Sequence, residues 1–115
     1  MRANAEEILK LVLARLDDMK AEETLTIDLR GKSSIGDYMV VSSGRSQRHV
    51  GSVADRVVED LHKAGVKAHV EGMPNCDWVV IDAGDVIVHV FRPEVRDFYN
   101  LEKMWPAGRP AKRAS

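Results

Sequence analysis

The sequence predicts a single-domain α/β fold, in which about five strands form a mixed sheet and two long helices cover one face of it. Two segments have apolar residues at the spacing of an α-helix, and several shorter ones alternate or form short apolar runs, as strands do. The length of 115 residues corresponds to one domain that can bury a real hydrophobic core.

The two helices are predicted over residues 4–21 and 46–64. In the first, the apolar side chains at helical spacing are Ile8, Leu9, Val12, Leu13, Leu16 and Met19. In the second, they are Val50, Val53, Ala54, Val57, Val58 and Leu61. Gly65 follows the second helix in the usual helix-stop position.

Three strands are predicted at residues 24–29, 37–43 and 66–70, with a polar loop at 30–36. The second helix lies between the second and third of these strands. Residues 37–70 are therefore predicted to form a βαβ unit whose two strands run parallel.

Residues 77–91 are predicted to form a β-hairpin, because turn-forming residues separate two strongly apolar segments. If Ala83 and Gly84 form a two-residue loop, the cross-strand pairs are Asp82 with Asp85, Val80 with Ile87, and Trp78 with His89.

The two faces of this hairpin differ in chemistry, since successive side chains of a strand point to opposite faces. One face is purely aliphatic: Val79, Ile81, Val86, Val88 and Val90. The other is mixed: Trp78, Val80, Asp82, Ile87, His89 and Phe91. A core needs only the aliphatic set. We therefore expect that set to face the helices, and the mixed face to be open or partly covered by a short helix that Pro93 begins.

Charge is unevenly distributed along the chain. Residues 1–70 carry 11 acidic and 11 basic side chains, residues 71–105 carry 7 acidic and 3 basic, and residues 106–115 carry 3 basic and none acidic. We predict a folded domain at 1–105 and a flexible basic tail at 106–115. The net charge of -1 argues against a surface built to hold nucleic acid, whereas an acidic, apolar region favours a basic protein partner.

Metal, disulfide and membrane sites have little support in the sequence. The single Cys76 excludes an internal disulfide, and His49, His62, His69 and His89 lack metal-ligand spacing. We expect no cofactor, no metal and no catalytic group. No apolar run approaches the roughly 20 residues that span a bilayer, and the first 20 residues lack the apolar core of a signal peptide. The cytoplasm is therefore the expected compartment.

Three segments resemble the Iojap family, also known as the ribosomal silencing factors: DYMVVSSGRSQRHVGSVADRVVE at 37–59, WVVIDAGDVIVHVF at 78–91 and RDFYNLEKMW at 96–105. The resemblance implies a fold similar to that of nucleotidyltransferases without their activity. It also implies a factor that binds the large ribosomal subunit through ribosomal protein fourteen, blocks docking of the small subunit and represses translation.

Such a factor acts by occupying space, so its functional residues are contacts. The predicted partner-binding residues are Trp78, Asp82, His89, Tyr99, Leu101, Glu102 and Trp105. Tyr99, Leu101 and the two Trp side chains would be apolar anchors, and the two acidic side chains would pair with Lys or Arg of the basic ribosomal protein. In the alternative, each Trp caps the core under the last helix, Tyr99 points inward, and His89 is a hydrogen-bonded sheet residue.

A second hypothesis is a nucleotide-binding or nucleotidyltransferase-type protein that uses the loop around Gly44. Residues 42–46 lie between a strand and a helix, where Arg45 and Arg48 would assist an anion at the helix N-terminus. Nucleotidyl transfer, however, needs carboxylates that hold Mg²⁺ near this loop, and the next predicted strand has none. The simpler interpretation is that Ser43 or Ser46 caps the helix.

In a third hypothesis, the mixed sheet face forms a homodimer, and the family resemblance allows a dimer that opens on binding the ribosome. Ribosome binding should fail in Trp78→Ala or Glu102→Lys and tolerate Ser43→Ala, whereas nucleotide chemistry predicts the reverse pattern. If the mixed face forms a homodimer, Trp78→Ala should convert the dimer to a monomer. The basic residues of the tail, Arg109, Lys112 and Arg113, would add at most a minor contact with ribosomal RNA.

Overall fold

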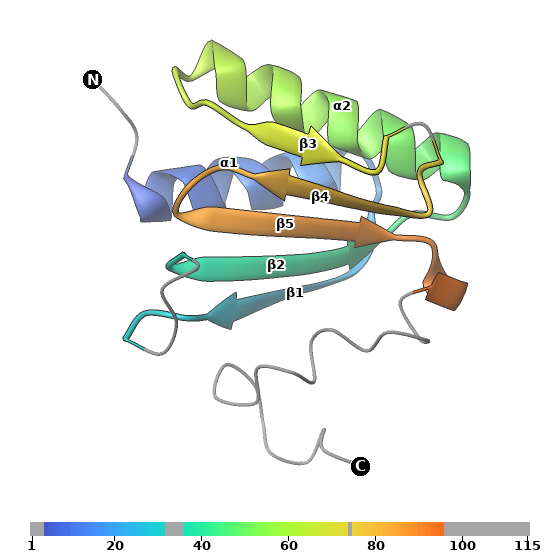
Figure 1. The fold of residues 1–115 in the computed structure, drawn as a ribbon, viewed down its shortest axis with the longest axis horizontal. Helices are drawn as coiled ribbons and strands as arrows, with labels where there is room; N and C mark the ends of the chain where they lie inside the picture. The colour runs from blue at the N-terminus through green and yellow to red at the C-terminus, as the bar shows by residue number, and fades with distance from the viewer. Residues whose placement is uncertain (1–3, 32–35, 74, 96–115) are drawn as a thin grey trace.

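The computed structural model describes residues 4–31, 36–73 and 75–95. Along this part of the chain the elements are α1 (Ala5–Asp18), β1 (Glu22–Asp28), β2 (Tyr38–Ser43), α2 (Gln47–Lys63), β3 (His69–Glu71), β4 (Trp78–Asp82) and β5 (Val86–Phe91). The strands form one five-stranded sheet in the order β1-β2-β5-β4-β3, and both helices lie on the same side of it (Figure 1). The predicted single-domain α/β fold is confirmed.

The sheet is mixed. Strands β2 and β5 pair in parallel, whereas the β1–β2, β4–β5 and β3–β4 pairs are antiparallel. It follows that β3 runs parallel to β2, as the predicted βαβ unit requires. The two strands are not neighbours, however, because the β4–β5 hairpin lies between them.

Helix boundaries follow from side-chain caps. Asn4 and Glu7 form a capping box at the start of α1, and the Ser46 side chain accepts a hydrogen bond from the backbone N–H of His49 at the start of α2. At the end of α2, the Val66 N–H donates to the Leu61 carbonyl. Since Val66 closes the helix, β3 begins only at His69, and the prediction of a strand from residue 66 is wrong at its start.

The predicted hairpin register is also wrong, by two residues. Trp78 pairs with Phe91, Val80 with His89 and Asp82 with Ile87. Ala83 closes the hairpin by donating to the Val86 carbonyl, and Gly84 at the tip has a φ of +86°, which glycine adopts without strain. Because a slip of two residues preserves the alternation of faces, the predicted composition of each face is correct.

The main core lies between the sheet and the helices. The aliphatic set of the hairpin is fully buried there: Val79, Ile81, Val86, Val88 and Val90. Helix α1 contributes Ile8, Val12 and Leu16, and α2 contributes a stripe that includes Val53 and Val57. The expectation that the aliphatic face points toward the helices is confirmed.

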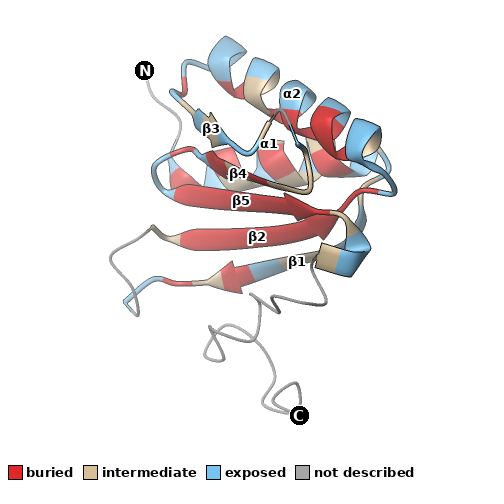
Figure 2. Cartoon of the chain, turned by 45° about the vertical axis from the view of Figure 1, so that its right-hand side comes forward, coloured by how far each residue is buried: buried red, intermediate tan, exposed pale blue. Residues whose placement is uncertain are grey.

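The opposite face of the sheet is less open than predicted. A second cluster is buried there, formed by Ile27, Leu29, Met39, Val41 and Phe91, with Trp78 and Val95 packed against it. Ile87 and His89 on the same face are also buried. Figure 2 shows burial along the whole of β2 and β5 and exposed or intermediate residues along β3. The expectation of an open mixed face is therefore wrong at β5, because flanking strands supply apolar side chains to it.

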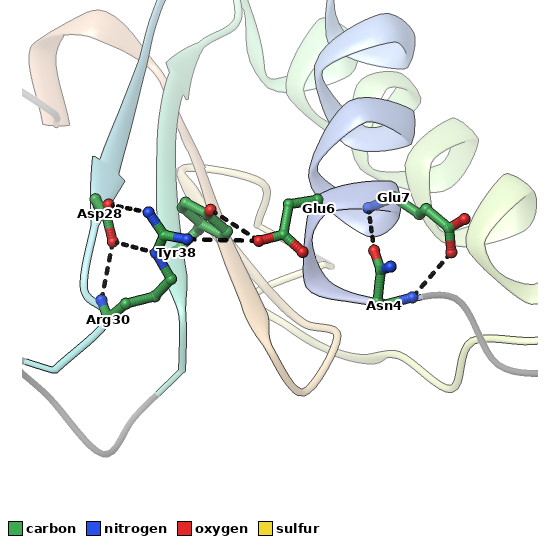
Figure 3. Close-up of polar contacts among 6 residues, drawn as sticks. All are labelled: Asn4, Glu6, Glu7, Asp28, Arg30 and Tyr38. Carbon is green, nitrogen blue, oxygen red and sulfur yellow. Dashed lines mark hydrogen bonds and ion pairs between the residues drawn. The ribbon is translucent and has the colours of Figure 1, made fainter.

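A polar cluster joins α1 to the β1–β2 edge of the sheet (Figure 3). Arg30 donates from Nε and Nη2 to the two carboxylate oxygens of Asp28, at 3.0 and 2.8 Å. Its guanidinium also lies 5.2 Å from the centroid of the Tyr38 ring, and Nη1 lies 3.5 Å from a carboxylate oxygen of Glu6. These contacts fix the N-terminal end of α1 against the sheet.

Candidate functional site

On the helix-free face, β3 and the adjoining part of β4 carry exposed polar side chains. The register places His69 opposite Asp82 and Glu71 opposite Val80, so these side chains share a face with Trp78. We call these five residues the β3–β4 strip. His69, Glu71 and Asp82 are exposed, and Val80 and Trp78 are half-buried. The strip thus presents two carboxylates, an imidazole and apolar surface together.

Trp78 is the largest side chain of the strip. Its indole stacks on the Phe91 ring, with 5.0 Å between centroids and 24° between planes. Its Nε1–H donates a hydrogen bond to His89 Nδ1 at 3.1 Å. One side of the indole therefore belongs to the second core cluster, while the residue as a whole remains half-buried. This combination of a fixed ring and remaining exposure is typical of an aromatic anchor.

His89, predicted as a partner contact, lies in the interior at 8% exposure. Burial lowers the pKa of its imidazole to about 4, so the ring is neutral at physiological pH. The prediction that His89 lies directly opposite Trp78 is wrong, because the two residues are diagonal neighbours on one face. Diagonal neighbours are still close enough for their side chains to meet.

Asp82 carries the exposed carboxylate at the end of β4. One of its oxygens accepts from the backbone N–H of Gly84 at 2.9 Å, which orients the side chain at the hairpin tip. Beside it is a hollow of about 490 Å³. The hollow is lined by Gly65, Val66, Lys67, His69, Asp82, Ala83 and Gly84. Asp82 is therefore placed where a cationic side chain of a partner can reach it.

Asp77 and Arg92 form an ion pair that the sequence patterns did not predict. Arg92 Nε donates to Asp77 Oδ1 at 2.8 Å, and the Gln47 amide of α2 donates to the same oxygen at 3.0 Å. The Arg92 backbone N–H also donates to the Asp77 carbonyl. The correct hairpin register, in which Trp78 faces Phe91, would have predicted this pair. Asp77 thereby fixes where the chain leaves β5, one residue before the helical turn that begins at Pro93.

The remaining predicted contacts are Tyr99, Leu101, Glu102 and Trp105, and all lie outside the described residues. So does the predicted tail at 106–115. The placement of Trp78 and Asp82 on one exposed strip is the part of the predicted site that the structure brings together.

The loop around Gly44 satisfies its polar groups internally. Ser46 caps α2, and the Gly44 N–H donates to the Phe91 carbonyl. The Arg45 N–H donates to His49 Nδ1, and His49 Nε2 lies 2.7 Å from the Met19 carbonyl oxygen. A Cβ on Gly44 would come within 2.7 Å of the Val50 side chain, so glycine is required there for close packing. The interpretation of Ser46 as a helix cap is confirmed.

In the part of the chain that the structure describes, no group of three or more His, Cys, Asp or Glu side chains is arranged to hold a metal ion. Nor does any helix in residues 4–31, 36–73 or 75–95 have the length and apolar character to cross a membrane.

A family model described as "Ribosomal silencing factor during starvation" matches residues 2–115. The chain belongs to the ribosomal silencing factor family. A ribosomal silencing factor of Zymomonas mobilis is 55% identical over 104 residues, which cover 90% of this chain and 78% of the relative. The family resemblance seen in the sequence is thus confirmed.

A solved structure supports the same fold, and a more distant relative extends the sequence similarity. A crystal structure of a protein from Chromobacterium violaceum superposes with a TM-score of 0.88 at 38% identity, covering 94% of this chain and 91% of the other. The mouse protein named "Mitochondrial assembly of ribosomal large subunit protein 1" is 27% identical over 99 residues, which cover 83% of this chain and 43% of the relative. These relatives are named for regulation or assembly of ribosomes where their names state a role.

Proposed function

We propose that this protein acts in the cytoplasm, where it binds the large ribosomal subunit through ribosomal protein fourteen and sterically blocks the small subunit from joining. Translation falls as a result. The observation that carries this proposal is the β3–β4 strip, where a fixed, half-buried Trp78 shares one face with the exposed carboxylates of Glu71 and Asp82.

The chemistry of the strip suits a basic ribosomal protein. A Trp that is already immobilised by Phe91 and His89 loses little conformational freedom when a partner covers it. The flanking carboxylates attract Lys and Arg side chains, and such charges affect the association rate and orientation more than the affinity. Tyr99, Leu101, Glu102 and Trp105 would extend the contact from the C-terminal segment.

Inhibition of subunit joining needs no chemical step. It needs only a rigid domain bound at the surface that the small subunit would cover. An interface of standard size buries about 800 Å² on each partner.

Co-sedimentation with separated ribosomal subunits, followed by addition of the small subunit at fixed Mg²⁺, tests the proposal. We expect the protein to migrate with the large subunit alone and to reduce the yield of joined ribosomes. Trp78→Ala should weaken binding by about 30-fold or more, the size expected for an aromatic anchor at the centre of an interface. Glu102→Lys should also weaken it.

A matched pair of charge variants separates the strip from general electrostatics. Asp82→Asn removes the charge but keeps an oxygen for the Gly84 N–H, and should slow association by about two- to fivefold. Asp55→Asn, on the exposed side of α2, makes the same charge change and should leave association unaltered. Failure of the unsubstituted protein to bind either subunit would overturn the proposal, as would equal effects of the two Asn variants.

The homodimer hypothesis predicts a different result for the same protein. If the strip joins two copies, Trp78→Ala should convert a dimer into a monomer in size-exclusion chromatography with light scattering. A dimer that dissociates on adding the large subunit would be compatible with our proposal, because both partners would use one surface in turn.

A further inference from the structure

The contact between Trp78 and His89 defines the orientation of the half-buried indole. The indole Nε1–H can only donate, so His89 Nδ1 must be an unprotonated acceptor in the 3.1 Å hydrogen bond between them. His89 lies on the central part of the sheet, directly opposite Val80 of the strip, and is 8% exposed. A buried histidine therefore provides the hydrogen-bond acceptor for Trp78, which is only partly buried.

Phe91 supplies a second constraint on the same ring. It stacks on Trp78 at 5.0 Å and on His89 at 6.0 Å, with 15° between the planes of the His89 and Phe91 rings. Stacking fixes the plane of the indole but does not distinguish the two ring orientations that rotation about χ2 allows. The hydrogen bond to Nδ1 makes that distinction, because only one orientation directs Nε1–H toward His89.

We propose that His89 is a positioning residue for ribosome binding, which holds the Trp78 indole in the single orientation that its partner recognises. This inference rests on the function proposed above. His89 itself is buried and makes no direct contact with the partner. Its effect is to reduce the conformational freedom that Trp78 loses on binding, and its loss should weaken binding by about two- to tenfold.

Two isosteric substitutions separate the hydrogen bond from packing. In His89→Asn, the side-chain oxygen is bonded to Cγ, as Nδ1 is in histidine, so it can accept from Trp78 Nε1–H. His89→Leu has a branch of similar shape at Cγ and no acceptor. We expect the Asn variant to bind the large subunit nearly as well as the unsubstituted protein, and the Leu variant to show the two- to tenfold loss.

Nuclear magnetic resonance of the free protein reports the orientation directly. The indole Nε1–H resonance of Trp78 is assigned by its disappearance in Trp78→Phe, which separates it from that of Trp105. In His89→Leu this resonance should move and its hydrogen exchange with solvent should accelerate. In His89→Asn both should stay close to those of the unsubstituted protein. Thermal unfolding of each variant checks that the fold is retained.

A double-mutant cycle tests whether His89 acts through Trp78. In the Trp78→Phe background, His89→Leu should cause no further loss of binding, because phenylalanine has no N–H to position. The same loss in both backgrounds would overturn the inference, since His89 would then act through general packing. Equal weakening by the Asn and Leu variants would overturn it too.

The outcomes also separate this inference from the proposed function. If His89→Leu shifts the Trp78 resonance while large-subunit binding stays intact, the positioning role is wrong and the proposed function stands. If the unsubstituted protein binds neither subunit, the proposed function fails and the inference fails with it.

Discussion

The two faces of the sheet are built from the same hairpin but differ in what closes them. On one face, helices α1 and α2 cover five aliphatic side chains that are fully buried. On the other, the centre at β2 and β5 is buried and the β3–β4 strip remains exposed or half-buried. The helix-covered face depends on volume and hydrophobicity alone. The second face depends on individual side chains, since one tryptophan and one histidine set its chemistry.

The largest difference is expected for two adjacent residues of β4 that point to opposite faces. Ile81→Ala should lower the free energy of unfolding by about 2–5 kcal/mol, because it leaves a cavity in the helix-covered core. Val80→Ala, on the half-buried strip, should lower it by about 1 kcal/mol or less. Urea unfolding followed by circular dichroism measures both. Equal losses would show that the two faces contribute equally to stability at β4.

A smaller effect is expected from pH on the second face. Burial lowers the pKa of His89 from 6.5 to about 4. Well above pH 6.5, both states hold a neutral His89. As the pH falls toward 4, the unfolded chain takes up a proton and the folded one does not. Stability should therefore fall by up to about 1.4 kcal/mol per pH unit, or about 1.5 kcal/mol in all between pH 6.5 and 5.

His89→Asn is the control for this pH dependence, because it keeps the acceptor without a titratable group. As the pH falls from 6.5 to 4, the unfolding free energy of the unsubstituted protein should decrease relative to that of this variant. Asp60 titrates below this window. Desolvation opposes the shift, but ion pairs with Arg56 and Arg15 lower the pKa of its carboxyl below the ordinary 3.8. Parallel curves for the two proteins would contradict the assignment of the slope to His89.

The smallest effect concerns stability without binding. Ser46→Ala removes the cap of α2 and should cost about 1 kcal/mol of unfolding free energy. Affinity for the large subunit should be unchanged, because α2 lies on the side of the sheet away from the strip. Ser52→Ala, at an exposed position within α2, is the matched control: it should leave affinity unchanged and raise the unfolding free energy by about 0.5 kcal/mol or less, because alanine has the higher helix propensity. Weaker ribosome binding by Ser46→Ala would place part of the interface on the helix side.

Local patterns were sufficient to predict the helices, the strand faces and the placement of Trp78 and Asp82 on one face. They could not predict the hairpin register, which depends on the positive φ of Gly84 rather than on turn composition. That error concealed the Asp77–Arg92 pair. They also could not predict the burial of His89, because Met39 and Val41 come from a strand that joins β5 only through long-range parallel pairing. The burial of His89 thus depends on the order of the strands in the sheet, which local sequence patterns do not determine.

The two edges of the sheet have a consequence for the protein at high copy number. Strand β3 is only three residues long, and the register of β1 shifts between Glu22 and Leu25, where Glu23 has a positive φ. Short or irregular edge strands offer a poor template for another strand. At high concentration the domain is therefore protected against edge-to-edge aggregation.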